Sequence, residues 1–361
     1  MATDLKKTIV IILKYGVPIA IIGWLLASVP QESYRQLEQR PKDWTLLVLA
    51  LGLVFTAVSV TFVRWHLLVR TLQLQFRLLD AFRLGFLGYL FNFVSAGAVG
   101  GDLFKAFFIA RQQPKRRAEA IATVVVDRMV GLYALLLLTS GVILAGNLGQ
   151  YSPELWTLSC FTLTATGLGG IAVLILLIPG FTNGVVSRFL RELPRIGQAL
   201  GRVILAIRIY RQCWRAMLIA LLLSIGTHVM LALTLFLTAR ALYEHIPTLR
   251  EHLIIVPLSM VAGALPFTPA GFGAFEFALE KLYQIVPTAE NISAAGVLVA
   301  LVYRLLQIVV AAIGMLIYWS SRSEVRQLIE EVEHNQEGQS RPPNQNTPSL
   351  RASHQGDATG H

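Results

Sequence analysis

Four charged residues stand in or beside apolar stretches, where a charge needs a partner. Asp102 and Glu276 each follow a glycine-containing break in such a stretch, and Arg128 and Arg304 follow these acids by 26 and 28 positions. A charged side chain inside a bilayer costs about 2.5–3.5 kcal/mol on insertion scales. We therefore expect each arginine to pair with the acid of its own interval. Asp127 is not expected to pair with Arg128, because adjacent residues on a helix point in different directions.

The two breaks could also supply a binding site. Glycine lets the backbone turn sharply, and Pro269 would end a helix. Helix N-termini freed at such breaks present N–H groups and a partial positive charge, which suits an anion such as phosphate. Two such termini near the arginines predict a polar, anion-favouring cavity within the membrane. The acid–arginine pairs could contact a substrate there or only lock helices together, and the sequence leaves both roles open.

The candidate binding residues lie at the two breaks or in the helices that follow them. For a lipid headgroup they are Asn92, Asp102, Lys105, Arg128, Pro266, Thr268, Pro269, Gly271, Gly273, Glu276 and Arg304. Acid–base or metal chemistry would need clustered carboxylates or histidine ligands. The sequence has no Asp-x-Asp, no His-x-x-x-His and no nucleotide-binding glycine loop. No catalytic residue, metal site or cofactor is therefore predicted.

The elements that position these residues follow from composition. Hydrophobic residues make up 55% of the 361 residues, charged residues only 14%, and the mean hydropathy is +0.60. The apolar residues come in blocks of about 20, the length of a helix that crosses a bilayer, and only helices or closed barrels satisfy their backbone there. Because alternating strand patterns are absent, we predict an all-α polytopic membrane protein. Six full transmembrane helices are expected at 9–29, 43–63, 118–145, 155–179, 216–238 and 291–318.

Two further apolar stretches, 82–110 and 253–286, are broken near their middle by small residues or by Gly and Pro. Each half is too short to cross the bilayer, so each stretch is predicted to be a re-entrant helical hairpin that enters and leaves on one side. Basic residues on both flanks of 82–110 agree with this, because Lys and Arg collect on the cytoplasmic side. A single crossing would place Arg111–Arg117 outside.

The net charge of +10 is explained by this topology and by anionic lipid headgroups, not by nucleic acid. With both termini cytoplasmic, the predicted inner segments carry most of the basic residues. These include Arg64, Arg70, Arg77 and Arg83 in the loop 64–83, and the arginines of 180–215. The predicted outer loop 146–154 has neither Lys nor Arg.

The order of transmembrane helix, hairpin and transmembrane helix occurs twice, at about 43–145 and 216–318. The two copies would enter the membrane from opposite sides, as in transporters built from inverted repeats. We therefore predict one transmembrane domain, 1–321. Segment 180–215 is expected to be a basic, amphipathic cytoplasmic segment, and 322–361 a largely disordered cytoplasmic tail.

At the two breaks the sequence resembles a known family. The residues Asn92, Gly100-Gly101-Asp102 and Asp127-Arg128, with Pro266-x-x-Pro269-x-Gly271-x-Gly273-x-x-Glu276, look like those of the flippase-like transmembrane family. This family includes the membrane domain of lysylphosphatidylglycerol synthases, and the resemblance covers about 10–320. It departs at Pro269-Ala270-Gly271, where the family usually has Pro-Gly-Gly, and at Asp127-Arg128, where it usually has Glu-Arg. These departures weaken a transfer of the exact substrate more than of the fold.

The resemblance implies a bacterial or archaeal inner-membrane protein that moves, or helps to move, a polar lipid between leaflets. The substrate would be an anionic phospholipid or a polyprenyl-phosphate-linked lipid. No soluble synthase domain follows the hydrophobic part, so lysyl transfer is not expected. Two alternatives remain open: a non-transporting membrane partner of a lipid-modifying enzyme, and a membrane-embedded glycosyl- or phosphotransferase.

Overall fold

The computed structural model describes residues 17–94, 100–146, 153–177, 209–264, 273–286 and 294–320, and all regular structure in these ranges is α-helical. The predicted helical class is therefore confirmed. The chain divides into two units, 1–317 and 318–361. The predicted tail 322–361 and most of the predicted amphipathic segment 180–215 lie outside the described residues.

Five of the described helices are long and apolar enough to cross a membrane. They are α4 (Trp44–Thr71), α7 (Arg117–Gly146), α8 (Pro153–Leu177), α12 (Trp214–Leu242) and α15 (Gly296–Ser320). Each overlaps one predicted transmembrane helix. Residues 9–16 of the predicted helix 9–29 lie outside the described residues, and the remainder corresponds to α2 (Val17–Ser28). Between α2 and α4 lies the short polar helix α3 (Gln31–Gln39).

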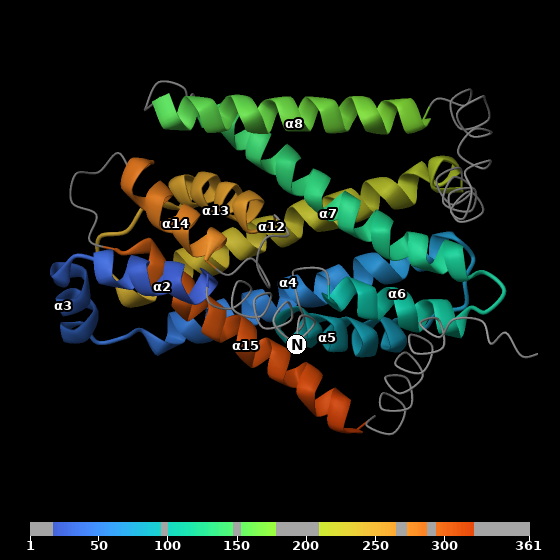
Figure 1. Ribbon diagram of the computed structural model, residues 1–361, viewed down its shortest axis with the longest axis horizontal. Helices are drawn as coiled ribbons and strands as arrows, with labels where there is room; N and C mark the ends of the chain where they lie inside the picture. The colour runs from blue at the N-terminus through green and yellow to red at the C-terminus, as the bar shows by residue number, and fades with distance from the viewer. Residues whose placement is uncertain are drawn as a thin grey trace, which may run out of the picture. The chain divides into compact units, whose positions relative to one another are not determined.

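Helices α4 and α12 run antiparallel, side by side, through the centre of the first unit (Figure 1). At one end the Asp43 N–H donates to the Ala241 carbonyl at 3.2 Å. At the other end the Tyr210 hydroxyl donates to the Leu68 carbonyl at 3.0 Å. Small residues on both helices are fully buried, including Ala57, so the two backbones can approach closely as in other membrane helix pairs.

Helices α5 (Leu78–Val94) and α6 (Gly100–Gln112) form the first hairpin. It begins and ends beside the C-terminal end of α4, because the Gln113 side chain donates to the Gln75 carbonyl at 2.7 Å. The two helices pack so tightly that a Cβ on Gly101 would lie 2.0 Å from the Gly88 carbonyl oxygen. Glycine at position 101 is therefore required by this close approach.

Helices α13 (Leu249–Gly263) and α14 (Ala274–Ile285) form the second hairpin, at the opposite end of α4 and α12 (Figure 1). Its two ends meet where His252 Nε2 lies 2.7 Å from the Tyr283 hydroxyl. The start of α15 joins them, since the Val297 N–H donates to the Glu280 carboxylate at 2.9 Å. Reciprocal hydrogen bonds between Thr248 and Glu251 fix the start of α13.

Candidate functional site

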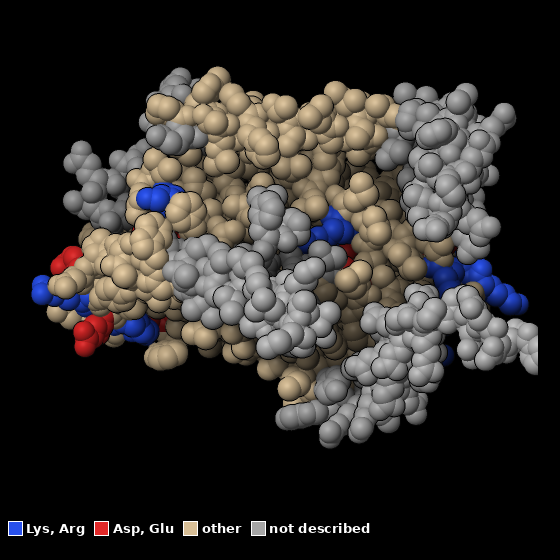
Figure 2. Space-filling view, viewed as in Figure 1, with Lys and Arg blue, Asp and Glu red and all other residues tan. Residues whose placement is uncertain are grey.

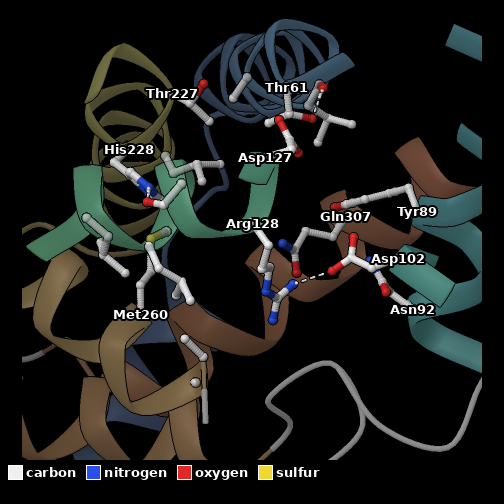
Figure 3. Close-up of a pocket in the computed structure, with 18 of the residues that line it drawn as sticks. Thr61, Tyr89, Asn92, Asp102, Asp127, Arg128, Thr227, His228, Met260 and Gln307 are labelled. Carbon is white, nitrogen blue, oxygen red and sulfur yellow. Dashed lines mark hydrogen bonds and ion pairs between the residues drawn. The ribbon is translucent and has the colours of Figure 1, made fainter. Parts of the chain in front are cut away.

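A cavity of about 370 Å³ lies between the helices, within the usual size range of small-molecule sites (Figure 3). Its wall takes residues from all of α4–α7 and all of α12–α15, so both predicted repeats contribute. The apolar part includes Ala57, Val58, Leu132, Leu135, Leu231 and Met260. The charged part consists of Arg64, Asp102, Lys105, Asp127, Arg128 and Arg304. This concentration of charge inside a bundle of apolar helices marks the cavity as the candidate site.

The pair Asp102–Arg128 crosses the cavity from α6 to α7 (Figure 3). Arg128 Nη1 donates to Asp102 Oδ2 at 3.1 Å, and the side chains are 37% and 20% exposed. Asp102 lies in the first turn of α6, where a carboxylate also faces the positive end of the helix dipole. Only one guanidinium nitrogen makes this contact, so Arg128 keeps donors that a bound anion could use.

The matching pair Glu276–Arg304 is buried. Arg304 Nε donates to Glu276 Oε1 at 2.7 Å, and the side chains are 9% and 0% exposed. The second Glu276 oxygen accepts the Gly273 N–H at 2.6 Å. Gly273 has φ 85°, a left-handed conformation that favours glycine. The Arg304 guanidinium also contacts Gln307 at 3.1 Å and lies 5.1 Å from the Phe275 ring centroid.

A third pair, Arg64–Asp127, joins α4 to α7. Arg64 Nε and Nη2 donate to the two Asp127 carboxylate oxygens at 2.7 and 3.0 Å, and Nη1 donates to the Ser224 hydroxyl at 2.7 Å. The prediction that placed Arg64 in an inner loop is wrong. Helix α4 continues to Thr71, and Arg64 is only 7% exposed. Its burial is tolerated because the bidentate carboxylate offsets its charge.

The side chain of Lys105 lines the same cavity without an acidic partner. In the described part of the chain no carboxylate oxygen lies within 4.0 Å of its ammonium. The ammonium instead lies 5.7 Å from the Phe62 ring centroid and 5.4 Å from that of Trp65. These are cation–π contacts, which attract the charge but do not neutralise it. The stem passes over Gly88, where a Cβ would lie 2.9 Å from Lys105 Cε.

The helix N-termini at the breaks are less available than predicted. The Gly101 N–H donates to the Asn92 side-chain oxygen at 2.9 Å, and the Gly273 N–H donates to Glu276. The expectation that these groups stay free for a bound anion is therefore wrong for both N–H groups. The chain supplies its own acceptors, because an unpaired buried N–H is costly. The cations that line this cavity are therefore side chains of Arg and Lys.

The structure brings together most of the predicted residues that it describes. Lining the cavity are Asn92, Asp102, Lys105, Arg128 and Arg304, while Glu276 and Gly273 support Arg304 from behind. Both predicted acid–arginine pairings are confirmed. Four predicted residues lie outside the described residues: Pro266, Thr268, Pro269 and Gly271.

Sequence reasoning missed several lining residues, including Arg64, Tyr89, His228 and Gln307. For Arg64, the sequence did contain one indication. Asp127 stood within a predicted transmembrane helix and could not pair with its neighbour Arg128, so it required a cation from another helix. The described residues contain no group of three or more His, Cys, Asp or Glu that could hold a metal ion.

These features define a multi-pass helical membrane protein with a charged cavity inside its bundle. Residues 10–314 match the sequence profile described as the lysylphosphatidylglycerol synthase TM region. The match covers most of the chain, and the protein belongs to this family of membrane domains. The family links it to lipid synthesis or translocation. Among curated proteins, no match was found.

Proposed function

We propose that this protein translocates, or helps to translocate, a polar anionic lipid between the leaflets of a bacterial or archaeal cytoplasmic membrane. One observation carries the proposal: the charged cavity takes residues from both sets of helices, α4–α7 and α12–α15. A polar headgroup needs such a path through the apolar bundle, whereas acyl chains can remain in lipid. Large apolar side chains exposed on α8 and α12, such as Phe161 and Leu222, are suited to contact those chains.

The proposed topology has six membrane crossings, the first within 9–29, and two re-entrant hairpins of opposite orientation. In support, one hairpin lies beside the C-terminal end of α4 and the other at the opposite end of that helix (Figure 1). Inverted repeats of this kind build transporters whose substrate site lies near the bilayer midplane. The positions of Asp102 and Glu276, in the first turns of α6 and α14, match under this proposal.

The proposed orientation places the α5–α6 end in the cytoplasm. Arg70, Arg77, Arg111, Lys115 and Arg215 are exposed at this end. Figure 2 shows Lys and Arg side chains at one end of the visible face, and Lys and Arg mixed with Asp and Glu at the other. The positive-inside rule assigns the mainly basic end to the cytoplasm, so the described chain would end there as well.

A vesicle assay tests the proposal. Purified protein is reconstituted with a fluorescent phosphatidylglycerol, and a membrane-impermeant reductant then bleaches label in the outer leaflet. Empty vesicles should lose about half of the signal, because label is present in both leaflets, whereas vesicles with the protein should lose more. Arg128→Ala and Arg304→Ala should abolish the gain, and Arg215→Ala serves as the control at an exposed position. Exchange no faster than in empty vesicles across a broad lipid panel would refute translocation.

The basic end favours a second candidate, a non-transporting membrane protein that recruits a lipid-modifying enzyme through its inner surface. Such a role depends on the arginines of 188–215, among which Arg215 is exposed, rather than on the cavity. Their substitution would impair function, whereas Arg128→Ala would be tolerated. The reverse pattern in the same variants supports translocation.

A further inference from the structure

The charges of the cavity do not balance. Three arginines line it, and each has a carboxylate partner: Arg64 with Asp127, Arg128 with Asp102 and Arg304 with Glu276. Among the described lining residues, and leaving His228 aside, Lys105 is the charged side chain that remains. Counted over the described residues, the lining side chains and the carboxylates paired with them therefore sum to one positive charge. In a space surrounded by apolar helices, that charge acts over a longer range than it would in water.

Lys105 is placed to act on the same ligand as Arg128. It follows Asp102 by three positions on α6, so the two side chains project from one face of that helix, where Cβ atoms are about 5–6 Å apart. Asp102 in turn holds Arg128 Nη1 at 3.1 Å. Arg128 and Lys105 thus both line the cavity as neighbours of Asp102.

The aromatic contacts of Lys105 hold the ammonium in place but do not neutralise its charge. Phe62 and Trp65 present their rings at 5.7 and 5.4 Å from Nζ. Both rings are buried, at 1% and 0% exposure, so they form a fixed wall. Lys105 as a whole is half-buried, and it lines the cavity. A cation that is held in place in a cavity without a neutralising partner discriminates between ligands by their charge.

We infer that Lys105 selects headgroups with one net negative charge, held as a phosphodiester anion between the Lys105 ammonium and the outer donors of Arg128. This inference rests on the proposed translocation and names the substrate class of the same cavity. A headgroup such as phosphatidylglycerol cancels the extra charge. A zwitterionic headgroup brings its own cation, so the cavity keeps its net charge and gains an ammonium beside Lys105 and Arg128. Choline and ethanolamine lipids are therefore disfavoured, because like charges at close range repel.

The test compares two lipids in one preparation. Fluorescent phosphatidylglycerol and phosphatidylcholine are placed in matched vesicles with wild-type protein, and their leaflet-exchange rates are measured by reductant bleaching. We expect exchange of phosphatidylglycerol to be roughly ten-fold faster, as for one charge-assisted hydrogen bond. Lys105→Gln should bring the ratio of the two rates close to one, Lys105→Arg should keep it high, and Lys115→Gln, at an exposed position, should leave it unchanged.

Each outcome bears on a different claim. A wild-type ratio near one overturns the selection by Lys105, and no variant is needed for that conclusion. A high wild-type ratio that stays high in Lys105→Gln overturns the selection as well. Either result leaves translocation itself standing, because lipid still moves. If wild-type protein moves neither lipid, the proposed translocation is refuted, and the selection by Lys105 is refuted with it. A folding defect in Lys105→Gln would appear as a lowered melting temperature. The selection is then judged by the ratio of the two exchange rates in wild-type protein and in Lys105→Arg.

The same phosphate chemistry could come from free phosphate instead of a lipid. A third arm therefore measures uptake of radiolabelled inorganic phosphate into the same vesicles. We expect no uptake above empty vesicles. Uptake that depends on Lys105, in vesicles that show no selective lipid exchange, would assign the cavity to the free anion and overturn the lipid reading.

Discussion

The two hairpins hold chemically equivalent pairs in different environments. Glu276–Arg304 beside the second hairpin is almost fully buried, and its acid also accepts the Gly273 N–H. Asp102–Arg128 beside the first hairpin is partly exposed, at 20% and 37%. Its single hydrogen bond is 3.1 Å long, against 2.7 Å in the buried pair. The difference separates the two roles that the sequence left open: Glu276–Arg304 has the geometry of a structural lock, and Asp102–Arg128 that of a pair able to accept a ligand.

The largest effect is expected from breaking the buried pair. Arg304→Ala leaves the fully buried Glu276 carboxylate without its cation, which should cost about 3–5 kcal/mol in the free energy of unfolding. Unfolding in mixed detergent micelles, followed by circular dichroism, measures this loss. The double variant Glu276→Gln/Arg304→Gln removes both charges and should recover most of the stability. A single variant as stable as wild type would remove the distinction between the pairs.

The first hairpin is expected to depend on glycine packing rather than on a buried charge. A Cβ in Gly101→Ala would lie 2.0 Å from the Gly88 carbonyl oxygen, so α5 and α6 must separate, at a cost of about 1–3 kcal/mol. The same unfolding measurement applies. Gly141→Ala on α7 is the control, because nothing lies within 4 Å of a Cβ at that position. Equal melting temperatures for the two variants would argue against the close approach.

Arg64–Asp127 shows that the first half also contains a lock, placed on α4 and α7 rather than at the hairpin. Arg64→Lys keeps the charge but loses the two parallel bonds to Asp127 and the bond to Ser224. We expect a loss of about 1–2 kcal/mol in the free energy of unfolding, because an ammonium cannot make the bidentate contact. Exchange of labelled lipid should fall less than in Arg128→Ala. A fully stable Arg64→Lys protein would mean that charge alone suffices at this site.

The smallest stability effect is expected at the exposed pair. Arg128→Ala should cost less than about 1 kcal/mol, since the contact is a single 3.1 Å hydrogen bond between two partly exposed side chains. Lipid exchange should nevertheless be lost, because Arg128 supplies donors to the cavity. A near-normal melting temperature together with lost exchange would distinguish Arg128→Ala from Arg304→Ala, which is expected to lose stability. Normal exchange by Arg128→Ala would instead assign both pairs to structure.

Local patterns were enough to predict much of the site. Asp102 with Arg128 and Glu276 with Arg304 could be paired from their intervals, because each acid and arginine belong to neighbouring helices of one short unit. Arg64 and Asp127 are 63 positions apart, and no local pattern connects them. Glu280 on α14 is likewise only 8% exposed, and it accepts the Val297 N–H at the start of α15. Its role depends on where another helix begins in space.

The sequence by itself determined that the chain is a helical membrane protein, where five of its long helices lie, and which acids pair with Arg128 and Arg304. Hydrophobic length and the cost of a buried charge are local constraints that composition and spacing express directly. Only the tertiary structure decided which pair is buried, that Arg64 lies inside the bundle, and that Lys105 lines the cavity without an acidic partner among the described residues. Those outcomes depend on the rotation and crossing of helices distant in sequence, since burial and charge balance are sums over neighbours from several helices.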